Sequence, residues 1–164
     1  MKFYRYVLAV LFAGIIITVY GQGADYVATV KAACNKTDNT NSLILVKFTT
    51  DNGTELSGYF KDNELVKIRS VAAFPDGRYE DEYYYMNGQM VYVYEVEKHF
   101  VLDPESGGKT DQLNVAFSGN YYLMSGKIVL ENKVGFQKDI KRTTAAVFLK
   151  DSKKYAELIR SHKQ

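Results

Sequence analysis

The chain has 164 residues, with 21 basic and 19 acidic side chains, fourteen tyrosines and one cysteine. Without Lys2 and Arg5, near its start, the basic and acidic side chains are equal in number. No basic excess is left to bind phosphates, so we expect no nucleic-acid partner. A single cysteine cannot form an internal disulfide, and about 140 residues suffice for one hydrophobic core. The composition thus predicts one domain that is stabilised by packing alone.

The first residues have the pattern of a secretory signal. Two cationic residues precede an uncharged run from Tyr6 to Tyr20, and small residues follow it. The run is shorter than the roughly 20 residues that a membrane-spanning helix needs. We predict a signal peptide at residues 1–22, cleavage near Gln22, a periplasmic or secreted location, and no stable membrane span after cleavage. An uncleaved N-terminal anchor is the alternative. Residues 23–164 then form the single domain.

Three segments align on their turn residues and predict repeated β-hairpins. Each has aromatic residues, then a two-residue step, then an aliphatic strand. The step Asn87-Gly88 is typical of a type I′ turn, which needs positive φ at both central residues. Asp62-Asn63 and Ser125-Gly126 are variants of the same chemistry. The unequal spacing of the three turns indicates an irregular repeat and not a solenoid.

A two-residue turn fixes which residues face each other across a hairpin. Side chains alternate between the faces of a strand, so the facing pairs nearest the turns should share one apolar face. We predict that this face is the core. The predicted pairs are Phe60 with Leu65, Tyr85 with Met90, Tyr83 with Tyr92, Leu123 with Ile128, and Tyr121 with Leu130.

The opposite face repeats a tyrosine and valine pair. Two interpretations remain open: a second packed face, or an exposed tyrosine-rich surface for a partner. On the second, the candidate binding residues are Tyr59, Tyr84 and Tyr122. The valines are Val66, Val91 and Val129, and Ile68 and Val93 extend the face.

The remaining segments complete the predicted architecture. Further strands are expected at Leu43–Thr50, Lys67–Phe74 and Gln137–Thr143, a turn at 51–54, and a polar loop at Leu102–Gln112. We predict an α+β, mainly antiparallel β fold: a meander of repeated hairpins with short terminal helices on one sheet face. The C-terminal helix is expected to begin at Asp151 or Ser152 and to carry the apolar stripe Tyr155, Leu158, Ile159 and His162; the N-terminal helix carries Tyr26, Val30, Ala33 and Cys34.

Few residues suggest chemistry. Glu95, Glu97 and His99 share one face of a strand and are weak candidates for metal ligands, although polar alternation at a strand end explains them equally well. The cluster at residues 80–82 is expected to be a solvated edge that resists strand addition. Cys34 is either a buried small side chain or a free thiol. We identify no catalytic or cofactor-binding motif, so an enzymatic role is without support.

The unit from Tyr83 to Val91 resembles MORN-type repeats of antitoxin or immunity-like proteins, and the chain is similar to small exported β proteins of Gram-negative bacteria. The resemblance implies an interaction role without chemistry. We predict an exported, non-enzymatic binding module that recognises a protein or envelope component through its sheet face and the loop Leu102–Gln112. The alternatives are an immunity or inhibitor protein against a cognate toxin or enzyme, and a metal-dependent enzyme that uses Glu95, Glu97 and His99.

Overall fold

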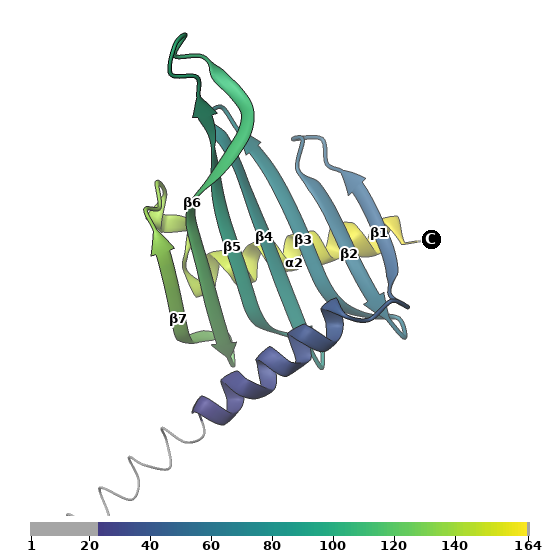
Figure 1. The fold of residues 1–164 in the computed structure, drawn as a ribbon. Coiled ribbons are helices and arrows are strands. Elements are labelled where there is room, and N and C mark those ends of the chain that lie inside the picture. The colour runs from purple at the N-terminus through teal and green to yellow at the C-terminus, as the bar shows by residue number, and fades with distance from the viewer. Residues whose placement is uncertain (1–22, 164) are drawn as a thin grey trace, which may run out of the picture.

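The computed structural model describes residues 23–163, which form a seven-stranded antiparallel sheet with a helix against each face (Figure 1). Strand order follows the sequence, so each strand pairs with the strands next to it in the chain. The predicted α+β meander is therefore confirmed, whereas residues 1–22 and the predicted cleavage site lie outside the described residues. The strands are β1 Ile44–Thr49, β2 Glu55–Lys61, β3 Glu64–Phe74, β4 Gly77–Met86, β5 Gln89–Leu102, β6 Lys109–Met124 and β7 Lys127–Gly135.

All three predicted hairpin turns have positive φ at both central residues. The φ angles are 51° and 73° at Asn87 and Gly88, and the weaker pairs Asp62-Asn63 and Ser125-Gly126 adopt the same conformation. Asparagine, aspartate and glycine reach this region most easily, while serine does so less often. The three hairpins β2–β3, β4–β5 and β6–β7 are thus confirmed together with their turn type.

The predicted register holds only for the predicted pair nearest each turn. Phe60 faces Leu65, Tyr85 faces Met90 and Leu123 faces Ile128, as expected, but each hairpin then contains a β-bulge. The bulge inserts one extra residue into the second strand and shifts all later pairs by one. Two predicted pairs are therefore wrong: the partners found are Tyr83 with Val93 and Tyr84 with Tyr92, and Tyr121 with Glu131 and Tyr122 with Leu130.

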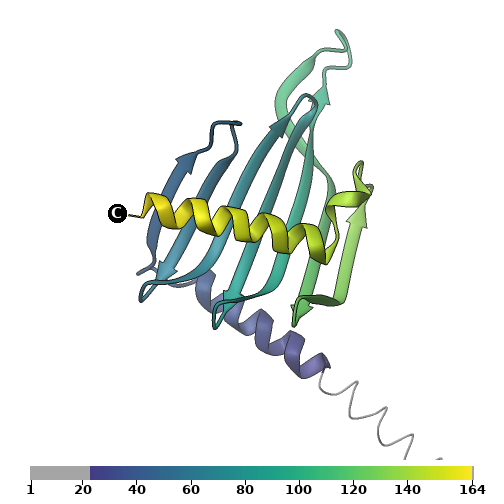
Figure 2. The same cartoon turned by 180° about the vertical axis from the view of Figure 1, so that it is seen from behind.

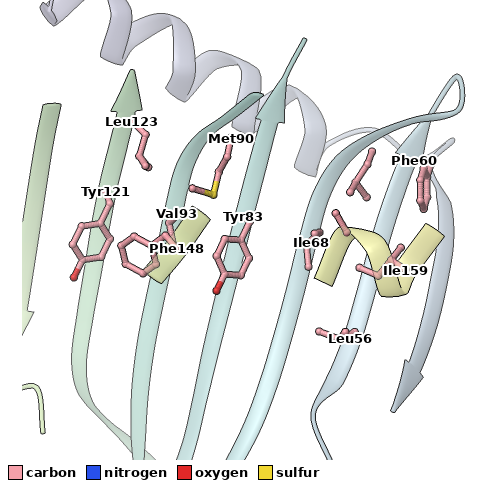
Figure 3. Packing of buried hydrophobic residues seen from close by; sticks show 12 residues of the cluster. Leu56, Phe60, Ile68, Tyr83, Met90, Val93, Tyr121, Leu123, Phe148 and Ile159 are labelled. Carbon is pink, nitrogen blue, oxygen red and sulfur yellow. The ribbon is translucent and has the colours of Figure 1, made fainter. Parts of the chain in front are cut away.

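The main core lies between the sheet and the C-terminal helix α2, Ala145–His162 (Figures 2 and 3). Ile159 packs so closely on β2 that a Cβ built on Gly58 would lie 2.3 Å from the Ile159 Cγ2 atom. Ile68 and Val93, which we expected on the opposite face, also belong to this core. Its buried members are Leu56, Phe60, Leu65, Ile68, Tyr83, Met90, Val93, Tyr121, Leu123, Phe148, Ala156 and Ile159.

The N-terminal helix, residues 23–38, covers part of the other face (Figures 1 and 2). Val30 and Cys34 are buried against Tyr84, Val91 and Tyr122. Tyr26 also packs on this cluster, so three of the four residues of the predicted apolar stripe are confirmed; the fourth, Ala33, is not part of the cluster. The expectation that both helices cover one face is wrong. Adjacent tyrosines point to opposite faces, and each face has enough apolar surface to bind a helix of its own. Among residues 23–163, no helix is long and apolar enough to cross a membrane.

Two predicted elements near the C-terminus are corrected. Residues 137–143 do not form a strand; they contain the 3-10 helix η1, Ile140–Arg142. Helix α2 begins earlier than predicted because Thr144 caps it, its hydroxyl accepting a hydrogen bond from the Val147 N–H at 3.3 Å. Strands β5 and β6 also extend into the predicted polar loop, and their hairpin projects beyond its neighbours (Figure 1).

Candidate functional site

A cleft of about 530 Å³ opens between helix 23–38 and the sheet. Its sheet wall carries an aromatic row in which the ring centroids of Tyr84, Tyr92 and Tyr122 lie 5.5 and 5.0 Å apart. The Tyr92 hydroxyl donates to the Asn120 side-chain oxygen, so the row is also held at its polar end. The cleft combines aromatic faces with amide, hydroxyl and charged groups; its remaining lining residues are Lys31, Cys34, Asn35, Asp38, Glu82, Tyr94, Ser118 and Asn120.

A compact polar cluster closes one end of the cleft. The Lys67 ammonium lies 2.8 Å from an Asp38 carboxylate oxygen and 3.0 Å from a Glu82 oxygen, and it sits 4.6 Å from the centroid of the Tyr84 ring. The Tyr84 hydroxyl is within donating distance of both carboxylates, at 3.0 and 2.9 Å. Asp38 belongs to the helix and the others to the sheet, so the cluster anchors the helix end and gives this wall a fixed shape.

Cys34 supplies the one thiol of the chain and lines the cleft. Burial, followed by the charge of Asp38, raises the pKa of its thiol to about 12. The thiol is therefore protonated at neutral pH, and the thiolate is the form that reacts. Cys34 is therefore a buried small side chain, as one of the two interpretations expected.

The structure separates the three candidate binding residues. Tyr84 and Tyr122 line the cleft, but each is only 4% exposed because helix 23–38 packs on it. Tyr59 lies outside the cleft, in a neighbouring hollow of about 350 Å³ that it shares with Lys67. Sequence analysis missed Tyr94 and Asn120, which are half-buried and line the cleft. Their period-two spacing from Tyr92 and Tyr122 was the signal that could have identified them.

A second group of polar residues is buried on the α2 side of the sheet. Asp81 faces Glu95 across β4 and β5, and Glu97 is the next residue of β5 on that face. Asp81 is 5% exposed, and both glutamates are fully buried. The interpretation of residues 80–82 as a solvated edge is thus wrong, because β4 is a central strand. The turn that places it there is Pro75-Asp76, and Pro-Asp-Gly is a turn signal in the sequence.

Residues 137–142 supply the partners of these carboxylates. The Arg142 guanidinium lies 3.0 Å from an Asp81 oxygen and 3.4 Å from a Glu95 oxygen. The guanidinium also stacks over the Tyr79 ring, with the Arg142 Cζ atom 3.7 Å from the ring centroid. One arginine thus serves two buried carboxyl groups, and the Asp81 Oδ1 atom has no hydrogen-bond partner among the residues that the structure describes. We call Asp81, Glu95 and Arg142 the carboxylate cluster.

Glu97 and His99 lie beside the carboxylate cluster. The His99 Nε2 atom is 2.6 Å from one Glu97 oxygen, and the Lys138 backbone N–H donates to the other at 3.3 Å. Glu95, Glu97 and His99 do share a face, as predicted. However, within residues 23–163 no group of three or more histidine, cysteine, aspartate or glutamate side chains is arranged to hold a metal ion.

Burial controls the protonation of the carboxylate cluster. Loss of hydration raises the pKa of Asp81 to about 6, although Arg142 opposes the shift. Loss of hydration and the charge of Asp81 raise the pKa of Glu95 to about 7. Both carboxyl groups therefore bind protons more tightly in the folded than in the unfolded chain.

We expect the protein to be more stable at pH 5 than at pH 8. Raised pKa values add stability that is complete below the ordinary pKa values and is lost as the pH rises through about 6 to 7. Two shifts of this size predict a loss of about 3 kcal/mol in the free energy of unfolding, measured by urea titration at each pH.

Glu80 affects the stability only at a lower pH. Burial raises the pKa of its carboxyl group, but Lys98, Arg69 and Arg78 lower it by more, so the group is ionised between pH 5 and pH 8. A Glu95→Gln variant should flatten the pH dependence of the free energy of unfolding, whereas constant stability of the unsubstituted protein between pH 5 and pH 8 would contradict the expectation.

Comparison of the chain with protein-family models, curated proteins and solved structures found no match.

Proposed function

We propose that the protein is an exported, non-enzymatic binding module that recognises a protein or envelope component in the cleft between helix 23–38 and the sheet. The carrying observation is the cleft itself, whose volume of about 530 Å³ lies in the range of ligand-binding hollows. Its half-buried tyrosines, Tyr92 and Tyr94, offer rigid contact area with little loss of side-chain entropy. Export rests on the predicted signal peptide.

The charges around the cleft favour a polar ligand with an apolar face. Lys31 stands at one side with its ammonium 5.9 Å from the centroid of the Tyr122 ring, and Asp38 and Glu82 stand at the other. Beyond the cleft, Glu80 joins three cations in ion pairs of 2.6 to 3.0 Å, with Arg69, Arg78 and Lys98. A partner that spans both regions would meet alternating charge, which suits a specific protein surface better than a uniformly charged polymer.

The test is affinity capture of tagged residues 23–164 from the envelope fraction of the host. The unsubstituted protein should retain one component in constant stoichiometry, identified by mass spectrometry. Tyr94→Ala should weaken its capture by at least about tenfold, because truncated interface tyrosines commonly have effects of this size. Lys31→Glu should also weaken it. Neither substitution removes a fully buried side chain, so thermal unfolding should show that both variants are folded.

Lys36→Glu is the matched control. Lys36 is exposed on the same helix but does not line the cleft. The Lys36→Glu variant should capture the component as strongly as the unsubstituted protein does. If all four proteins retain the component equally, the cleft is not its binding site. A single tight protein partner would favour the immunity or inhibitor alternative within the same class of function.

A further inference from the structure

Strand β7 forms an open edge of the sheet. Within residues 23–163 it pairs only with β6. Its side chains are almost all exposed, including Val134 at 71% and Leu130 at 40%. Open edges are templates for pairing with another chain, and charged side chains commonly restrict which chain can pair. On β7 the central charges are Glu131 and Lys133.

The hydrogen bonds to β6 decide which backbone groups of this edge are free to pair. The Phe136 N–H donates to the Ala116 carbonyl at 3.0 Å, so Phe136 directs its backbone groups toward β6. In an antiparallel ladder every second residue does so. Asn132 therefore also points toward β6, while Glu131 and Lys133 direct their backbone N–H and C=O groups outward.

A second copy of β7 can meet these outward groups about a two-fold axis. The outward residues must face one another, so the axis must pass through a residue and not between two residues. An axis through Asn132 places Glu131 opposite Lys133 twice and Leu130 opposite Val134 twice. An axis one residue earlier or later places Glu131 opposite itself or Lys133 opposite itself, and opposed like charges destabilise a strand pair.

We propose that two copies of the protein associate through antiparallel pairing of their β7 strands, with the two-fold axis at Asn132. The sheet then runs through both subunits. Leu130 and Val134 lie on the cleft face, because their partners on β6 are Tyr122 and Ser118, which line the cleft. On the opposite face, the Glu131–Lys133 ion pair of 3.0 Å within one chain extends into a ladder of four alternating charges.

The test is sedimentation equilibrium of residues 23–164 over a range of concentrations. The unsubstituted protein should show an equilibrium between monomer and dimer. Glu131→Lys and Lys133→Glu should each raise the dissociation constant by at least about tenfold, since each brings two pairs of like charges together. The double variant with both substitutions restores opposite charges and should recover the dimer. A mixture of the two single variants should form a heterodimer, because every charge then meets its opposite.

Lys127→Glu is the matched control, because it changes an edge charge that has no partner in this register. It should leave the dissociation constant unchanged. Three results would overturn the proposal: a monomeric unsubstituted protein at every concentration, a dimer that tolerates Lys133→Glu, or a dimer lost on replacing Ile44 and Leu45, which are exposed on the opposite edge strand β1. Circular dichroism confirms that each variant is folded, so loss of the dimer cannot be mistaken for unfolding.

Discussion

Replacing Arg142 with methionine is expected to lower the free energy of unfolding by about 3 kcal/mol at pH 8 and by much less at pH 5. At pH 8 the substitution leaves the ionised carboxylates of Asp81 and Glu95 buried without a cation, and removing one partner of a buried ion pair is strongly destabilising. At pH 5 both carboxyl groups are mainly protonated, since their pKa values are about 6 and 7. Urea titrations at the two pH values measure the difference.

Lys141→Met controls for the loss of one positive charge. Lys141 precedes Arg142 but is exposed, so its replacement should change stability by less than about 0.5 kcal/mol at either pH. If Arg142→Met is equally destabilising at pH 5 and pH 8, then the stacking of Arg142 on Tyr79, and not its charge, accounts for its contribution.

Shortening Ile159 to alanine should lower the free energy of unfolding by about 3 kcal/mol. The Ile159 side chain is fully buried, so its removal leaves a cavity between α2 and the sheet. Gly58→Ala alone should lower it by about 1 to 3 kcal/mol, since the new methyl group collides with Ile159. The double variant should lose less than the sum, by about 1 to 2 kcal/mol, because the methyl group enters the space that Ile159 has left.

Gly108 supplies the control for this cycle. It lies in the loop between β5 and β6, where the nearest atom to an added Cβ is the Ser106 hydroxyl oxygen at 3.2 Å. Gly108→Ala should be nearly neutral and additive with Ile159→Ala. Additivity between Gly58→Ala and Ile159→Ala would contradict the prediction. It would show that α2 can move away from β2 at no cost in the free energy of unfolding.

Local chemistry made the hairpins predictable. The pair Asn87-Gly88 predicts a type I′ turn, because both residues reach positive φ easily. The aromatic and aliphatic residues around the pair favour strands. Asp62-Asn63 and Ser125-Gly126 could be recognised because they occupy the same place in a repeat. The bulge in β5 could not, since one additional residue leaves no signature in a segment such as Met90–Tyr94, whose residues are apolar on both faces.

Contacts between distant segments were beyond the reach of the sequence. Arg142 was hidden in a segment that resembled a strand, and only the fold brings it to Asp81. The cleft is a similar case: Tyr84 and Tyr122 were identified from the repeat, whereas its other wall comes from helix 23–38. The alternation that sends Asp81 to one face and Glu80 to the other was correct, but the neighbours that bury β4 were not visible.

The order of the strands has a consequence for how the protein folds. Each strand pairs with the preceding one after a short connection, so the sheet can grow hairpin by hairpin with little loop-closure entropy and few slow steps. Helix α2 is different, because it follows every strand in the chain yet reaches back to β1, where His162 stacks on Phe48 at 3.8 Å. In a chain delivered N-terminus first, the sheet would form early while its main apolar face waited for the last residues. That interval is when the chain is most exposed to aggregation and when a chaperone would have the most surface to bind.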